Sequence, residues 1–155
     1  MTGRSGKEVL ENLAGKDLND SGKIVNLVVT GNSRFYDFSF IEAELEMWVK
    51  YNEYPDLVIV GGASGVDYLA ERWAENQNIP IAVFTEVWKN PRQEDGIDSG
   101  RPQAPENLPD VMLENATHLL AFPGPGSVWT NEMILRAKKA NIPTVTVSLP
   151  MDEHE

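Results

Sequence analysis

The stretch that decides the fold is DLVIVGGASGVDYLAERWA, residues 56–74. It begins with a short apolar run, Asp56–Val60, without strict alternation of apolar and polar residues. Such a run is typical of a strand buried on both faces of a parallel sheet. Three glycines follow within five residues, and apolar residues then return at helical spacing from Val66 to Asn76. A buried strand, a glycine-rich turn and a helix in this order indicate an α/β fold.

The rest of the chain repeats this alternation. Apolar runs that predict further strands are Ile24–Thr30, Ile81–Thr85, Thr117–Phe122 and Thr144–Val147. Helical spacing of apolar residues predicts helices over Phe38–Tyr51, Leu108–Glu114 and Asn131–Ala140. Strands that alternate with helices predict a doubly wound parallel sheet with right-handed crossovers and helices on both faces.

Two segments depart from the alternation. Residues 1–22 are expected to form an N-terminal extension, so the α/β domain is expected over residues 23–150, with a tail at 151–155. The segment Trp88–Pro109 carries four prolines and no helical or strand pattern. Its length favours a lid, a binding loop or disorder.

Composition limits the classes of function. The chain has 155 residues, a formal net charge of −11 and no cysteine. The acidity argues against general nucleic-acid binding, which needs a basic surface. Without cysteine there are no disulfides or thiolate metal sites, and His, Asp and Glu show no metal-binding spacing, so no metal and no required cofactor are expected. No membrane-spanning run or signal peptide is present, which predicts a cytoplasmic protein.

Three expected strands end in turns that could bind an anion. In an open parallel sheet these turns lie on one edge, where ligands bind. The first loop is Gly31-Asn32-Ser33-Arg34. Its glycine allows close backbone approach, and its hydroxyl and guanidinium suit a phosphate. An ordinary strand-to-helix turn with a surface arginine would have the same sequence.

The second loop precedes the expected helix at Val66. It combines bare backbone with a helix N-terminus, which favours an anionic ligand. Asp67 has three readings: stabilising the helix dipole, accepting hydrogen bonds from a ribose or base, or supporting the loop from behind. The candidate ligand-binding residues of this loop are Gly61, Gly62, Ala63, Ser64, Gly65 and Asp67.

The third loop, Pro123–Glu132, is another candidate anion cradle. Its candidate ligand-binding residues are Pro123, Gly124, Gly126, Ser127 and Thr130. Either Ser127 or Thr130 could instead simply cap the following helix. Glu132 is expected in the first helical turn. There it would either stabilise the helix dipole, a purely structural role, or act as an acid–base or cation-stabilising carboxylate. His118 is expected to be structural.

Together the three loops resemble the SLOG superfamily, the Rossmann-like proteins that include the LOG phosphoribohydrolases and DprA. The resemblance is greatest to the YspA/YpsA-related branch, often encoded by bacteria and phages, and covers roughly residues 24–147. The residues that carry it are VVTGNSRFYDF (28–38), residues 56–74, the tryptophan of FTEVW (84–88), LLAFPGPGS (119–127) and LRAKKANIP (135–143).

The resemblance implies a five-stranded sheet in the order 3-2-1-4-5, a pocket for a nucleotide or an ADP-ribose-like ligand, and a homodimer. For a phage protein, it implies the host cytoplasm. Two departures from the family pattern stand out. The first loop reads Gly-Asn-Ser-Arg where relatives usually read Gly-Ser-Arg, and the third loop is one residue shorter than that of LOG enzymes. Relatives often carry an arginine after the tryptophan, and Arg101 is the candidate for that role in this chain.

Three functions follow from these features. The first is a sensing or sequestering module that binds a nucleotide-derived phosphate compound and breaks no bond. The second is a LOG-type nucleotide N-glycosidase, in which Glu132 would stabilise the ribosyl cation while Arg34 or Arg101 held the 5′-phosphate. The third is a partner-binding protein that keeps the fold without a ligand.

Overall fold

The computed structural model describes residues 24–84, 108–125 and 127–150. Its helices and strands are, in chain order, β1 (Asn26–Gly31), α2 (Phe38–Asn52), β2 (Leu57–Val60), α3 (Val66–Asn76), β3 (Ile81–Val83), α4 (Leu108–Leu113), β4 (His118–Phe122), α5 (Val128–Lys139) and β5 (Thr144–Thr146). The predicted N-terminal extension, most of the segment 88–109, and the tail lie outside the described residues. Within them, no helix has the length and apolar character needed to cross a bilayer.

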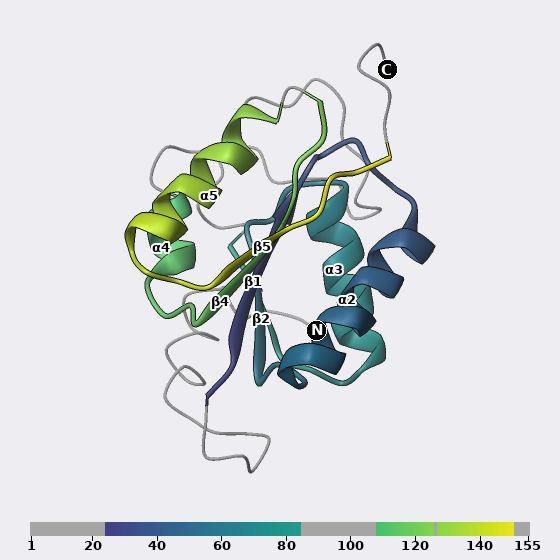
Figure 1. Cartoon of the computed structure of the whole chain (residues 1–155). Coiled ribbons are helices and arrows are strands. Elements are labelled where there is room, and N and C mark those ends of the chain that lie inside the picture. The colour runs from purple at the N-terminus through teal and green to yellow at the C-terminus, as the bar shows by residue number, and fades with distance from the viewer. Residues whose placement is uncertain (1–23, 85–107, 126, 151–155) are drawn as a thin grey trace.

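The strands form one parallel sheet in the order β3-β2-β1-β4-β5. The fold class predicted from the sequence, a doubly wound, Rossmann-like α/β fold, is therefore confirmed. β1 lies at the centre: Leu27 pairs with Val58 of β2 on one side and with His118 of β4 on the other. Figure 1 shows α2 and α3 over one face of the sheet and α4 and α5 over the other.

Successive residues of the central strands alternate between two cores, because side chains of a strand point to opposite faces. In β1, Val29 packs in the core that includes buried residues of α2 and α3, among them the fully buried Trp73. Val28 packs in the core that includes buried residues of α4 and α5, among them Met112 and Met133. Burial on both faces explains why the strands read as apolar runs rather than as alternating patterns.

Thr30 is the polar exception near the end of β1. Its side chain is completely buried, and among the residues that the structure describes its hydroxyl has no hydrogen-bond partner. A buried polar group in this state costs roughly 1–3 kcal/mol of stability. Thr117 is different, because its hydroxyl accepts from the Asn26 N–H at 2.8 Å.

We expect Thr30→Val to raise the free energy of unfolding by about 1 kcal/mol, since valine removes the unpaired hydroxyl at nearly constant shape. Urea unfolding of the purified protein measures this change. The matched control is Thr117→Val, which removes the acceptor of the Asn26 N–H and should destabilise the protein. A loss of stability in Thr30→Val would contradict the prediction.

His118 begins β4, at the sheet edge opposite the loops of interest. Its ring lies edge-on to Trp48, with centroids 5.4 Å apart, and its Nδ1 is 2.7 Å from Thr117 Oγ. Burial lowers the pKa of His118 below its ordinary value of 6.5, because the charged imidazolium is poorly solvated there.

The lowered pKa predicts a pH dependence. The unfolded chain takes up the His118 proton as the pH falls through 6.5, whereas the folded chain takes it up only at lower pH, so acidification favours the unfolded state. The contribution of His118 to the free energy of unfolding is constant well above pH 6.5, where the side chain is neutral in both states. We expect His118→Gln to lose less thermal stability than wild type between pH 7.5 and 5.5. Equal losses in the two proteins would contradict this.

Candidate functional site

The three loops predicted from the sequence meet at the carboxyl edge of the sheet, and Asn32 lies where they meet. The Asn32 N–H donates to the Phe122 carbonyl at 3.1 Å, at the end of β4. The Asn32 carbonyl accepts from the Val66 N–H at 3.2 Å, at the first residue of α3. The first loop is therefore bonded on one side to the helix after the second loop and on the other to the strand before the third.

Gly65 allows this close approach. It precedes α3 with φ of 66°, a conformation that L side chains rarely adopt. A Cβ at Gly65 would lie 2.4 Å from the Asn32 carbonyl oxygen, and one at Gly31 would lie 2.8 Å from the Phe122 carbonyl oxygen. Contacts between the loops thus require glycine at both positions, and at Gly65 the backbone conformation requires it as well.

Asp67 lies behind the second loop. The residue is 1% exposed, and its Oδ2 accepts from the N–H groups of Gly61 at 3.1 Å and Ala63 at 3.2 Å. This placement fits the reading in which Asp67 supports the loop from behind. Gly61 is tightly packed too, since a Cβ there would lie 3.0 Å from Met112 Sδ of α4.

The third loop departs from the sequence-based expectation. The predicted helix was to begin at Asn131, but α5 begins at Val128, because the Asn131 N–H already donates to the Ser127 carbonyl at 3.1 Å. Ser127 is therefore the N-cap residue, and the alternative cap at Thr130 is wrong. Thr130 is a buried residue inside α5, and Glu132 is outside the first turn.

The Ser127 side chain does not cap α5. Its hydroxyl oxygen accepts from the Gly124 N–H at 2.8 Å and from Asn32 Nδ2 at 3.3 Å. The third loop is thus closed on itself and joined to the first loop by a side-chain contact across 95 residues. Gly126 lies outside the described residues.

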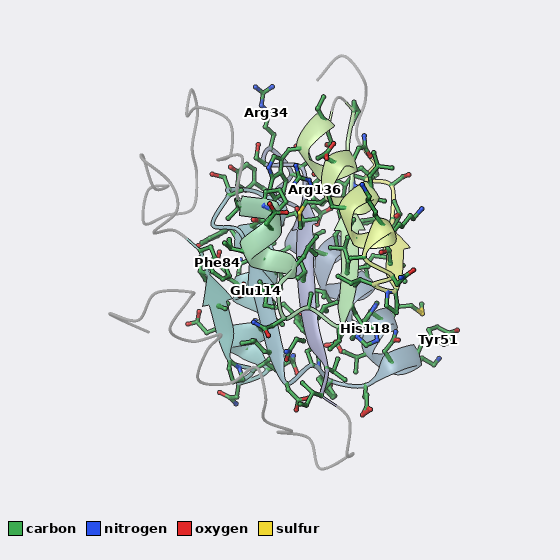
Figure 2. All side chains as sticks on the ribbon, turned by 90° about the vertical axis from the view of Figure 1, so that its left-hand side faces the viewer. Arg34, Tyr51, Phe84, Glu114, His118 and Arg136 are labelled. Atoms are coloured by element: carbon green, nitrogen blue, oxygen red, sulfur yellow. The ribbon has the colours of Figure 1, made fainter. Side chains whose placement is uncertain are left out.

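Ser33 and Arg34 are the exposed part of the first loop. The Arg34 N–H donates to Asn32 Oδ1 at 2.7 Å, which fixes the backbone where the arginine leaves the loop. Figure 2 shows the Arg34 side chain pointing away from the protein at the loop end of the molecule. Its guanidinium is therefore exposed to solvent.

Glu132 lies apart from the loop contacts. Its carboxylate forms an ion pair with Arg136 Nε at 3.0 Å, and Arg136 also contacts Asp110 of α4 at 2.9 Å. The hydrogen bond that Arg136 donates to Glu132, followed by the one that it donates to Asp110, raises the pKa of Arg136. These side chains line an open hollow between α4 and α5. The sequence signal for this pairing is the spacing of Glu132 and Arg136, four residues apart on one helix face.

Of the predicted site residues, the structure brings together Gly31, Asn32, Gly65, Gly124 and Ser127. It places Asp67 beneath them and Glu132 on the α4–α5 side. Arg101, the second catalytic candidate, lies outside the described residues, and its role stays a prediction. Within the described ranges, no group of His, Asp and Glu side chains is arranged to bind a metal ion.

We expect Gly65→Ala to destabilise the protein by about 1–3 kcal/mol, because the new Cβ meets the Asn32 carbonyl in a backbone conformation unfavourable to alanine. Urea unfolding measures the loss. Gly100→Ala, outside the described residues and the three loops, is the composition-matched control. Wild-type stability in Gly65→Ala would mean that the loops are not packed as described.

Comparisons with known proteins find a family match in the first part of the chain and a solved structure with a similar fold. Residues 25–90, which hold the first two loops, match the YspA, cpYpsA-related SLOG family. No curated protein matches the chain. Among solved structures, the Moco carrier protein from Chlamydomonas reinhardtii has a similar fold, with a TM-score of 0.53 and 21% identity over 83% of this chain and 79% of that one. The family match supports the resemblance to the SLOG superfamily across β1, β2 and their loops.

Proposed function

We propose that this chain binds a nucleotide or a nucleotide-derived phosphate compound, of the AMP or ADP-ribose type, across its three loops and breaks no bond in it. The observation that carries the proposal is the convergence of two helix starts, those of α3 and α5, on the first loop at one edge of the sheet. Ligands of open α/β sheets bind at this edge.

Both helix starts lack a side-chain cap. Gly65 before α3 has no side chain, and the Ser127 hydroxyl before α5 is turned back into its own loop. The Val66 N–H that opens α3 donates to the Asn32 carbonyl, while the helix dipole adds positive potential at both helix starts. This potential favours an anion such as a phosphate.

The charge distribution supports an anionic ligand at this edge in spite of the net charge of −11. Arg34 supplies a guanidinium that can make two parallel hydrogen bonds to a phosphate. Ser33 adds a hydroxyl on the same exposed turn. Backbone dipoles and one arginine suffice for a small anion, whereas a nucleic-acid backbone would need a wide basic surface.

The position of Glu132 favours binding over cleavage. An N-glycosidase needs a carboxylate beside the sugar carbon that is attacked, but the Glu132 carboxylate is paired with Arg136 on the side of α5 that faces α4. The name of the Moco carrier protein describes a protein that holds its ligand, which is compatible with a binding role for this fold. A homodimer stays a prediction of the family resemblance, and a cytoplasmic location stays a prediction from the sequence.

The experiment combines thermal shift with chromatography after incubation with AMP, ADP-ribose and NAD, each beside its phosphate-free nucleoside. We expect at least one phosphate compound to raise the melting temperature and to be recovered intact. Recovery of free base and ribose phosphate would instead establish the N-glycosidase. No shift with any compound would favour the ligand-free, partner-binding alternative.

The variant that probes the site is Arg34→Ala. Since the side chain is exposed, the fold should be unaffected, while affinity for the phosphate compound should fall by about tenfold, as for the loss of one charge-assisted hydrogen bond. Lys50→Ala removes the same charge from the last turn of α2, at the other end of the sheet, and should bind like wild type. Equal affinity of both variants would remove Arg34 from the site.

A further inference from the structure

Asn32 uses both its backbone and its side-chain polar groups to join the loops. Its backbone bonds to Phe122 and Val66, and its side chain bonds to Arg34 and Ser127. The Asn32 side chain is therefore a direct link between the first loop and the third.

The orientation of the Asn32 amide follows from its partners. The group that faces the Arg34 N–H must be the acceptor, so it is the oxygen, at 2.7 Å. The opposite atom, 3.3 Å from Ser127 Oγ, is then the nitrogen, which can only donate. Asn32 thus delivers an N–H to the serine hydroxyl oxygen.

Ser127 Oγ receives a second N–H from Gly124, at 2.8 Å. A hydroxyl oxygen has two lone pairs and one hydrogen. With both lone pairs taken by the two N–H donors, the hydroxyl can only donate to a further partner. No such acceptor contacts Ser127 in the described part of the chain, so its hydrogen is left for a group that binds at the loop.

We infer that Asn32 is a positioning residue that sets Ser127 as a hydrogen-bond donor and so selects a ligand group that only accepts, such as a phosphate oxygen, at the start of α5. The inference deepens the proposed function and rests on it. It adds a determinant of ligand polarity, which acts through Ser127 and without any need for Asn32 to touch the ligand.

An aspartate at position 32 would reverse this polarity. Its carboxylate can still accept from the Arg34 N–H, but its second oxygen can only accept from Ser127. The serine hydrogen would then bond to the aspartate and be lost to the ligand. Asn32→Asp therefore keeps the size and the loop turn while it removes the donor.

The first test needs no ligand. In an amide NMR spectrum of Ser127→Ala, the backbone N–H of Gly124 and the side-chain N–H of Asn32 should both move upfield, because each loses its acceptor. The side-chain N–H of Asn52, which donates to the Trp48 carbonyl, is the internal control and should not move. An unmoved Asn32 side-chain signal would overturn the inference whatever the ligand.

The second test measures AMP affinity by calorimetry in Asn32→Asp, Ser127→Ala and the double variant. We expect Asn32→Asp and Ser127→Ala each to lose about tenfold or more, the size of one hydrogen bond to a charged group. In the Ser127→Ala background the Asn32→Asp change should cost much less, since the residue acts through the serine. Equal costs in both backgrounds would overturn the inference.

Asn131→Asp is the control for the effect of the added negative charge on AMP binding. It adds the same negative charge to an exposed position one helical turn from Ser127, while the Asn32 amide stays in place. If it weakens AMP binding as much as Asn32→Asp does, the effect is electrostatic repulsion and the inference fails while the proposed function stands. If wild type does not bind AMP, the proposed function fails for AMP, and the NMR result decides the polarity of Ser127.

Discussion

The close approach of the first loop to the start of α3 is the contact on which the site depends. The Asn32 carbonyl oxygen lies only 2.4 Å from the position that a Cβ of residue 65 would take, and it accepts the N–H that opens α3. Only glycine permits both at once. Because β1 is the central strand, a shift of this loop would also displace the contact to Phe122 and, through Ser127, the beginning of α5.

Most of the fold could be predicted from the sequence, because the signals that set it are local. The apolar runs are continuous because the central strands have two buried faces, and the helices carry apolar residues at regular spacing. The order of the strands came from the resemblance, since no pattern within a strand says which strand lies beside it. The structure confirms both the elements and their order.

The site could be predicted only in part. The positions of the glycine loops follow from strand ends, but the partners inside the site are far apart in sequence. Ser127 looks like a helix cap or a phosphate ligand when read locally, and its bond to Asn32 spans 95 residues. Asp67 had three readings from the sequence, and its burial and its bonds to Gly61 and Ala63, which favour support of the loop, are not visible in a local pattern.

The residue at which α5 begins sets the position of Glu132, and so bears on whether the site suits binding or cleavage. The loop before this residue is held by the contact between Asn32 and Ser127. Had α5 begun at Asn131, Glu132 would have stood in the first turn, beside the loops. It begins at Val128, so Glu132 lies about 6 Å along the axis from the helix start, at 1.5 Å per residue. There it pairs with Arg136 instead of facing a ligand. The contact between Asn32 and Ser127 holds the loop that precedes this start, so the first loop also affects where Glu132 lies relative to the proposed ligand site.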